Sequence, residues 1–283
     1  MQKLKRTLAV HDISCFGKCS LTVALPVISA CGVEVTALPT AVLSTHTGGF
    51  TGYTFRDLTS DVRPIADHWK TVGIDFDAIY TGYLGSFEQI ELVSSIIDEF
   101  KKENTLVVVD PVMADNGKLY ASFPSDFPQG MKKLCRKADV IVPNMTEALF
   151  MLEKPYVEGP YTKEFIERTL SELCALGVKT AVLTGVYLDG ENLGAACMQS
   201  DGKVSYAFEK RIPEYYHGTG DVFASVLTGA LVSGASAEAA VQAAVKFTVE
   251  SLRRSYEEKT DTRFGVDFEH GLAGLPELIA SVR

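Results

Sequence analysis

The sequence predicts a three-layer α/β fold, with helices on both sides of a mostly parallel central sheet that ends in an antiparallel edge. Short apolar runs rich in β-branched residues alternate with longer segments of helical periodicity through most of the chain, a pattern typical of βαβ units. After Thr184 two apolar runs surround the turn Ser200-Asp201-Gly202, and such a turn favours a β-hairpin. With 283 residues, 46% of them hydrophobic, the chain has the material for a large core.

The expected strands of the parallel part are Thr7–Val10, Val33–Val42, Ala78–Tyr80, Thr105–Val109, Val140–Val142 and Thr180–Leu183. Apolar residues recur at helical spacing in Ser86–Lys101 and in Lys163–Leu176, which we expect to be crossover helices. The hairpin comprises Leu193–Met198 and Val204–Glu209. Two alanine-rich helices follow, the second over Ser236–Ser251 with Arg253-Arg254 at its end. Since no linker, low-complexity tract or repeat interrupts the chain, we expect residues 1–283 to form a single domain, although the usual size of about 150 residues would permit two.

Charge and composition exclude several classes of protein. The chain has 27 basic and 36 acidic residues, a net charge of −9, which is the wrong sign for tracking nucleic-acid phosphates. No apolar run approaches the roughly 18 residues that cross a bilayer, and Thr7–Val10 is too short for a signal-peptide core. Six cysteines occur without a CxxC pair, so neither a disulfide framework nor a zinc site is indicated. We expect a cytoplasmic protein with no nucleic-acid or membrane partner.

Polar or turn residues follow five of the predicted strands. They are His11-Asp12, Thr81-Gly82-Tyr83, Asp110-Pro111, Asn144 and Thr184-Gly185. Ligands of open α/β sheets bind outside the carboxyl ends of the strands. Any one of these residues is also a normal turn residue, but their accumulation at one sheet edge favours a ligand site there.

A glycine-rich segment, His217-Gly218-Thr219-Gly220-Asp221, directly precedes a predicted helix. Backbone N–H groups at the start of a helix attract an anion without any lysine, so Gly218, Thr219 and Gly220 predict a phosphate cradle. The dinucleotide fingerprint is incomplete here, and the chain contains no GxxxxGK[ST] motif. Asp221 beside such a cradle could accept a proton from an attacking hydroxyl. The alternative is an ordinary acidic residue in the first turn of a structural helix.

The run Asn144-Met145-Thr146-Glu147 has the spacing of a helix capping box. Glu147 could also join Asp110 and Asp115 in an acidic cluster that holds Mg²⁺, usually through water, because Mg²⁺ prefers carboxylate, water and phosphate oxygens. Both interpretations can be true together.

Five motifs in the same order resemble the pyridoxal (pyridoxine, pyridoxamine) kinase family of the ribokinase superfamily, over nearly the whole chain. They are Ser44-Thr45-His46-Thr47-Gly48, Thr81-Gly82-Tyr83-Leu84-Gly85-Ser86, Asp110-Pro111-Val112-Met113, Pro143-Asn144-x-x-Glu147 and Gly218-Thr219-Gly220-Asp221. The resemblance implies a ribokinase-like fold, a homodimer, and phosphoryl transfer from MgATP to the 5′-hydroxyl of a vitamin B6 vitamer in pyridoxal 5′-phosphate salvage. It also allows a monovalent cation such as K⁺.

The same resemblance assigns roles to individual residues. Asp221 would be the catalytic base, and the amides of Gly218, Thr219 and Gly220 would stabilise charge on the transferring group. His46, Thr47 and Tyr83 would contact the B6 ring. The ATP phosphates and their cations would lie along Asp110, Asn144, Glu147 and Thr184, with Arg211 near the nucleotide.

The chain departs from the family pattern at Asp12, where family members commonly have Ser, and in the run Gly17-Lys18-Cys19-Ser20-Leu21, where they have Gly-Asn-Ser. We hypothesise that the Asp12 carboxylate accepts a hydrogen bond from a protonated pyridine nitrogen, or from the amino group of a pyrimidine, more strongly than a hydroxyl would. Asp12 could instead cap the following turn or helix.

Two other functions stay open. A hydroxymethylpyrimidine kinase of the same superfamily also acts on a flat nitrogen heterocycle that bears a hydroxymethyl group. A non-catalytic B6-binding protein would keep the fold without turnover, although the intact Asp221 and its glycine-rich loop argue against it. A sugar kinase is disfavoured, because His11–Ser20 lacks the glycine-rich N-terminal signature of that branch.

Overall fold

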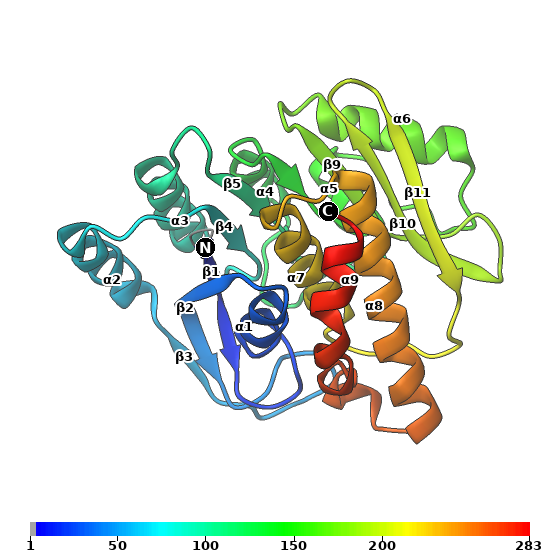
Figure 1. Ribbon diagram of the computed structural model, residues 1–283, viewed down its shortest axis with the longest axis horizontal. Coiled ribbons are helices and arrows are strands. Elements are labelled where there is room, and N and C mark those ends of the chain that lie inside the picture. The colour runs from blue at the N-terminus through cyan, green and yellow to red at the C-terminus, as the bar shows by residue number, and fades with distance from the viewer. Residues whose placement is uncertain (1–3) are drawn as a thin grey trace.

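The predicted strands form one nine-stranded sheet in the computed structural model, which describes residues 4–283. The strand order is β11-β10-β9-β8-β5-β4-β1-β2-β3 (Figure 1). The strands are β1 Arg6–Ser14, β2 Glu34–Leu43, β3 Phe55–Asp57, β4 Ala78–Thr81, β5 Leu106–Val109, β8 Val140–Ile141, β9 Thr180–Val186, β10 Asn192–Gln199 and β11 Val204–Lys210. A separate small hairpin pairs β6 Ala114–Asp115 with β7 Lys118–Leu119.

The parallel core of the sheet and its antiparallel edge are both confirmed. Strands β2, β1, β4, β5, β8 and β9 run parallel to their neighbours in that order, and β10 and β11 complete the sheet in antiparallel pairs. At the opposite edge β3 pairs antiparallel with β2. Its three residues are all exposed, and a strand this short leaves no apolar pattern for a sequence to show.

Helices cover both faces of the sheet and bury two separate cores. One face carries α2 Thr59–Val72, α3 Phe87–Phe100, α4 Phe127–Cys135, α5 Met145–Met151 and α6 Lys163–Cys174. The other face carries α1 Leu21–Ala30, α7 Thr219–Val232, α8 Ala237–Glu258 and α9 Leu275–Ser281, and Figure 1 shows α7, α8 and α9 side by side on it. Short 3-10 turns occur at Thr262–Phe264 and Glu269–Gly274. None of the helices in residues 4–283 is both long and apolar enough to span a membrane.

Several element ends differ from the sequence prediction. Strand β1 continues to Ser14 and β9 to Val186, so His11, Asp12, Thr184 and Gly185 lie within strands and not after them. The second alanine-rich helix continues to Glu258, so Arg253 and Arg254 lie inside α8 and not at its end. Within the helix the Arg254 guanidinium donates to the Asp267 backbone carbonyl at 2.9 Å and to the Ser251 hydroxyl at 3.0 Å. The prediction that the helix ends at Ser251, with Arg253 and Arg254 at its end, is therefore wrong.

The chain reverses its direction of travel across the sheet at β1, which pairs with β2 on one side and with β4 on the other. The carboxyl ends of β1 and β4 consequently open the crevice where ligands of this architecture bind. Helix α7 packs on α1 so closely that a Cβ on Gly229 would lie 2.5 Å from the Cys31 Sγ. This packing brings the amino-terminal end of α7 to the crevice.

Candidate active site

Asp221 lies in the first turn of α7, next to the glycine-rich loop. Burial and the negative charge of Asp12 together raise the pKa of its carboxyl to about 7, against the opposing effect of the Ser20 backbone N–H. A carboxyl with this pKa is partly ionised near neutral pH and can accept a proton efficiently. Asp221 therefore has the electrostatics expected of a general base.

The glycine-rich loop has a backbone that only glycine accommodates at its first position. Gly218 caps α7 with a left-handed φ of 78°, and a Cβ there would lie 2.2 Å from the Lys18 carbonyl oxygen. The close approach places the loop between β1 and α1 directly against the start of α7. Thr219 and Gly220 begin the helix, so their N–H groups are among those without an intrahelical acceptor.

Asp12 lies at the end of β1, almost completely buried. One carboxylate oxygen accepts a hydrogen bond from the Ser20 hydroxyl at 2.5 Å, and the other accepts one from the Ser14 hydroxyl at 2.8 Å. Burial raises the pKa of Asp12 despite these two bonds. The carboxylate is thus an internal clamp on the loop that follows β1, and its contact with a substrate ring stays a prediction.

An arc of aromatic rings borders the crevice above Asp12. The His46 ring lies 5.0 Å from that of His217 and 4.9 Å from that of Phe50. Its Nε2 is 2.6 Å from the Arg263 carbonyl oxygen, and its Nδ1 accepts the Gly48 N–H at 3.1 Å. These partners fix the imidazole with its proton on Nε2. Burial lowers the pKa of both His46 and His217, so this wall is neutral at pH 7.

The other residues predicted to contact a substrate ring lie at the edges of this arc. Tyr83 follows β4 and packs at 5.6 Å on the ring of Phe123, and its pKa is raised by burial and also by Asp12. Thr47 is exposed, next to His46. Tyr83 and His46 therefore approach Asp12 from two different loops, as a pocket for a flat ring requires.

The capping box predicted at the start of α5 is present. Glu147 Oε2 accepts the Asn144 N–H at 2.9 Å, and Asn144 Oδ1 accepts the Glu147 N–H at 3.0 Å. Glu147 Oε1 also accepts the N–H groups of Met113 at 3.1 Å and Ala114 at 3.5 Å, and Asn144 Nδ2 donates to the Ala114 carbonyl at 2.8 Å. The pair joins the segment after β5 to α5.

Asp110 and Glu147 are buried carboxyls that repel each other. Burial raises the pKa of Glu147 to about 8. Burial, then Glu147, then Asp221 raise the pKa of Asp110 well above its ordinary value. Within residues 4–283 no three His, Cys, Asp or Glu side chains converge as direct ligands of one metal ion. A cation near Asp110 would need water or phosphate oxygens to complete its shell, as Mg²⁺ usually does.

The remaining predicted site residues, Asp115, Thr184 and Arg211, lie in or beside three different strands. Asp115 accepts the Tyr215 hydroxyl at 2.6 Å, which ties β6 to the segment before the glycine-rich loop. Thr184 donates its N–H to the Pro143 carbonyl at 3.0 Å, beside Asn144. Arg211 is exposed and rests 5.4 Å above the ring of Tyr187, at the end of β11.

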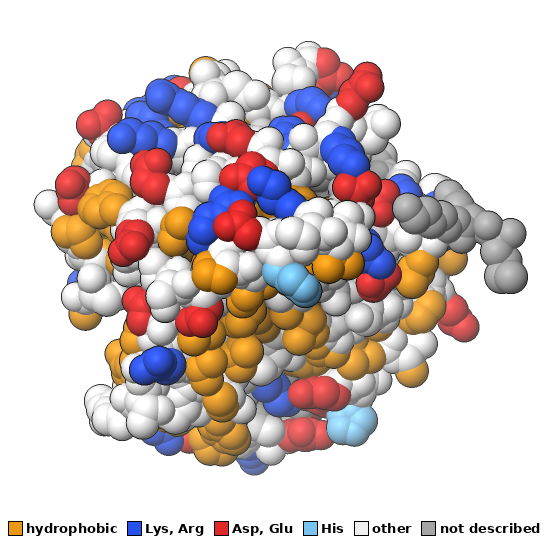
Figure 2. Space-filling view, turned by 90° about the vertical axis from the view of Figure 1, so that its left-hand side faces the viewer, with side chains coloured by type: hydrophobic (Ala, Val, Ile, Leu, Met, Phe, Trp, Pro, Cys, Tyr) orange, Lys and Arg blue, Asp and Glu red, His pale blue; other side chains and the backbone are white. Residues whose placement is uncertain are grey.

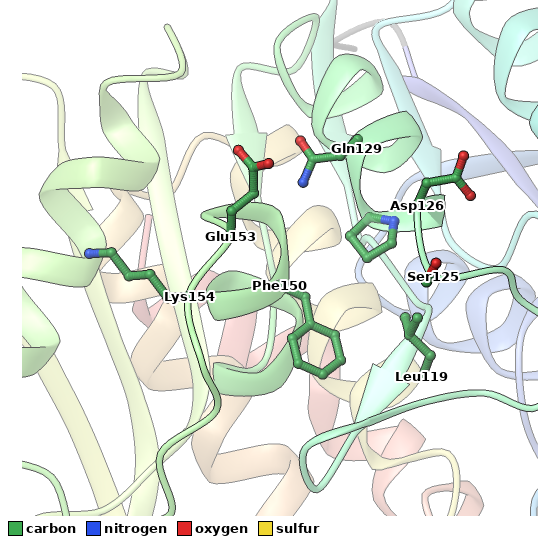
Figure 3. A pocket seen from close by; sticks show the side chains of 8 residues that line it. Leu119, Ser125, Asp126, Gln129, Phe150, Glu153 and Lys154 are labelled. Carbon is green, nitrogen blue, oxygen red and sulfur yellow. The ribbon is translucent and has the colours of Figure 1, made fainter.

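Two cavities lie outside this constellation. A cavity of about 420 Å³ lies among β7, α4 and α5, with Asp126, Glu153 and Lys154 among its lining residues; Figure 3 shows the Lys154 amine pointing away from the ring of Phe150 there. A groove of about 520 Å³ runs between residues 15–18 and 264–270, next to the loop that contacts Gly218. A proton acceptor lies beside helix amides in the acidic crevice. Neither cavity has this combination.

Sequence reasoning included His11 among the polar residues that favour a ligand site, but it missed Tyr80 and the complete burial of both side chains. His11 packs against Tyr80 at 4.3 Å between ring centroids, and both lie fully buried without a hydrogen-bond partner for His11 Nδ1, His11 Nε2 or the Tyr80 hydroxyl. Burial lowers the pKa of His11 to about 3. Ser14 and Ser20 were missed as partners of Asp12. Ser20 stands in the segment that departs from the family pattern, which was the only signal for it.

The chain is similar in sequence and in fold to known kinases. The family model Phosphomethylpyrimidine kinase matches residues 23–264. The crystal structure of pyridoxal kinase from Lactobacillus plantarum superposes with a TM-score of 0.89 at 33% identity, covering 98% of each chain. The chain belongs to the pyridoxal kinase family.

Other members of the pyridoxal kinase family and its superfamily match as well. A Bacteroides thetaiotaomicron protein assigned as a phosphomethylpyrimidine kinase, crystallised with pyridoxal, has a TM-score of 0.92 at 38% identity and covers 96% of each chain. Pyridoxine kinase from Bacillus subtilis (strain 168) is 30% identical over 191 residues, 66% of this chain and 67% of that protein. The ribokinase-like fold expected from the five motifs is confirmed, with its mostly parallel sheet and flanking helices.

Proposed function

We propose that this chain is an ATP-dependent kinase that transfers the γ-phosphate of MgATP to the 5′-hydroxyl of pyridoxal, pyridoxamine or pyridoxine, in pyridoxal 5′-phosphate salvage. The observation that carries the proposal is the position of Asp221. Its carboxyl is half-buried, with a pKa raised to about 7 chiefly by desolvation, and lies beside the free amides at the start of α7. Family membership supports the same reaction.

The chain's own residues would act by alignment and charge, which phosphoryl transfer needs most. Asp221 accepts the proton of the 5′-hydroxyl as that oxygen attacks the γ-phosphorus. The amides of Gly218, Thr219 and Gly220 face the transferring group and stabilise its negative charge, as helix amino-terminal ends do. Thr184, Asn144 and Arg211 then lie on the nucleotide side of the crevice.

The acidic pair fits a magnesium ion bound together with the nucleotide. The mutual repulsion of buried Asp110 and Glu147 is relieved by a cation, and the Glu147 oxygens already accept three backbone N–H groups. Asp110, Glu147 and Asp115 would therefore hold Mg²⁺ largely through water and phosphate oxygens. When bound, the ion neutralises charge on the transferring phosphoryl group. A monovalent cation such as K⁺ is part of the same proposal.

The acceptor ring would lie between His46, Thr47 and Tyr83, above Asp12. The neutral imidazole of His46 is fixed by its two hydrogen bonds, and a fixed aromatic wall selects a flat ring at little entropic cost. Asp12 would receive the ring's polar hydrogen.

The deciding experiment measures ATP consumption with pyridoxal, pyridoxamine, hydroxymethylpyrimidine and ribose, for the wild type and for Asp221→Asn. We expect turnover of the B6 vitamers and a loss of about 10²- to 10⁴-fold in kcat for the variant, the usual contribution of a general base. Binding of pyridoxal without phosphorylation of any acceptor would refute the kinase proposal and favour a non-catalytic B6-binding protein.

A hydroxymethylpyrimidine kinase is the second candidate. Two findings favour it: the matched family model is that of phosphomethylpyrimidine kinases, and Asp12 replaces the serine common in pyridoxal kinases. The ratio of kcat/KM for pyridoxal to that for hydroxymethylpyrimidine separates the two activities. A ratio below one would assign the chain to pyrimidine phosphorylation.

We further propose that the enzyme works as a cytoplasmic homodimer. Figure 2 shows hydrophobic side chains gathered on the face of the molecule that carries α2 and β3, and Phe55 of the edge strand β3 is 46% exposed. Edge strands with exposed apolar residues favour pairing with another chain. Sedimentation analysis of the wild type beside Phe55→Lys tests this, and a monomeric wild type would refute it.

A further inference from the structure

The loop between β1 and α1, Gly17–Ser20, has an unusual backbone. Gly17, Lys18 and Ser20 all have positive φ, of 106°, 54° and 57°, and Ser20 combines this φ with a ψ of −129° at the start of α1. Side-chain-bearing residues rarely adopt such conformations, which persist only where surrounding contacts hold them and which concentrate at functional sites.

The contacts that hold Ser20 come from Asp12. The Ser20 hydroxyl donates to Asp12 Oδ1 at 2.5 Å, and both side chains are more than nine-tenths buried. The serine does not use this hydroxyl to cap α1, as serines at this position normally do. Its side chain is committed to Asp12.

The backbone of Ser20 lies next to the start of α7, the helix that carries Asp221. The Ser20 backbone N–H lies close enough to the Asp221 carboxylate to oppose the rise in its pKa. Next to it, the Lys18 carbonyl oxygen lies 2.2 Å from the position that a Cβ of Gly218 would take. The loop therefore lies against both Asp221 and the glycine-rich loop. Four other titratable groups interact electrostatically with Asp221: the charge of Asp12 raises the pKa of Asp221, and the charge of Asp221 raises the pKa values of Cys19, Tyr80 and Asp110.

We propose that Ser20 is a positioning residue: its hydroxyl, anchored on Asp12, holds a strained backbone that aims the Ser20 N–H at the Asp221 carboxylate. The inference rests on the proposed role of Asp221 as the base. In this proposal the hydrogen bond between Asp12 and Ser20 connects the residue expected beneath the substrate ring with the residue expected to accept the proton. A shift of the carboxylate by about 1 Å from its productive position costs up to about 100-fold in rate.

The kinetic test compares Ser20→Ala, Ser20→Gly and Ser14→Ala with the wild type. Alanine lacks the anchor and is strained at this φ, so we expect a fall of about 10- to 100-fold in kcat with KM for the acceptor changed less than about 3-fold. Glycine tolerates the conformation and should recover part of the lost kcat. Ser14→Ala removes the other donor to the Asp12 carboxylate and should lower kcat less than about 3-fold.

Equal losses in Ser20→Ala and Ser14→Ala, or no recovery in Ser20→Gly, would overturn the inference. A second measurement does not depend on turnover: the backbone amide resonance of Ser20 should shift in Asp221→Asn, whereas that of Ser14 should not. An unshifted Ser20 amide also overturns the inference. A wild type without kinase activity refutes the proposed function instead, and the amide shift then still decides whether Ser20 faces Asp221.

Discussion

Single residues at the crevice owe their properties to burial rather than to nearby opposite charges. Asp221 is the clearest case, since burial is the largest cause of its raised pKa and Asp12 adds to it. Neither effect is visible in the sequence, where Asp221 is one acidic residue among 36. The motif predicted a base at this position, and the structure supplies the reason why its pKa falls near neutrality.

The pH dependence of kcat/KM should follow the protonation of Asp221. The base must be ionised to act, so activity should decline about tenfold per pH unit below a pKa near 7. Substituting Asp12→Asn removes a neighbouring negative charge and should move this acid limb to lower pH. The measurement is kcat/KM for pyridoxal between about pH 5 and about pH 9. A flat profile across neutrality would contradict the role of Asp221.

Asp12 should also affect the choice of acceptor. A carboxylate accepts a hydrogen bond from a cationic ring nitrogen more strongly than a hydroxyl does, so Asp12→Ser should raise KM for pyridoxal by about 5- to 50-fold, equivalent to about 1–2 kcal/mol. Steady-state KM values for pyridoxal, pyridoxamine and hydroxymethylpyrimidine provide the check. Unchanged acceptor preference would restrict Asp12 to its internal bonds with Ser14 and Ser20.

At the scale of elements, sequence periodicity predicted several helices and the central strands. It did not predict elements that are too short to show a pattern, or features that depend on contacts between distant residues. Helix α3 and strand β4 fall within a residue of their predicted bounds, because periodic burial fixes both. Strand β3 has three exposed residues and no pattern. The hydrogen bonds of Asp12 with Ser14 and Ser20 depend on the turn after β1, which brings Ser20 back beside the strand. Residue propensities do not encode such a contact.

A single methyl group added where the loop Gly17–Ser20 packs against the start of α7 should lower the stability of the protein. Gly218→Ala would place its Cβ 2.2 Å from the Lys18 carbonyl oxygen at a φ of +78°, so we expect a loss of about 2–4 kcal/mol of stability. Gly220→Ala is the matched control, because nothing lies within 4 Å of its Cβ position. Chemical denaturation of both variants tests the contrast. Equal stability of the two would contradict the close approach of loop and helix.

At the scale of the whole molecule, the net charge of −9 is unevenly distributed between surface and crevice. Some carboxyls nearer the surface form ion pairs, such as Glu99 with Arg63 and Lys70, whereas Asp12, Asp110, Glu147 and Asp221 act electrostatically on one another in one region. Under the proposed function an acidic protein can handle phosphate, because backbone amides would meet the anion while the acidic groups would meet the cation and the proton.

This crowding should make the ligand-free protein less stable as the pH rises. Asp221 and Glu147 have folded-state pKa values raised to about 7 and about 8, while the unfolded chain ionises them near 4. Between those values the folded state binds more protons than the unfolded state, so the stability they contribute is present at low pH and is lost as the pH rises to about 8. At the acid end, Glu99 works in the opposite direction, since its ion pairs lower its pKa to about 2. Its contribution is lost only below about pH 4.

Thermal unfolding between about pH 6 and about pH 8.5 measures this effect, at roughly 2–4 °C of Tm for each kcal/mol. We expect Tm to fall over that range, and MgCl2 to raise Tm more at the alkaline end, where the carboxyls are ionised and a cation relieves their repulsion. Asp110→Asn should flatten the decline, whereas the matched variant Glu91→Gln, at an exposed carboxyl of α3, should leave it intact. A Tm that does not fall with pH, or a Glu91→Gln effect equal to that of Asp110→Asn, would mean that the crevice carboxyls do not control the stability of the molecule.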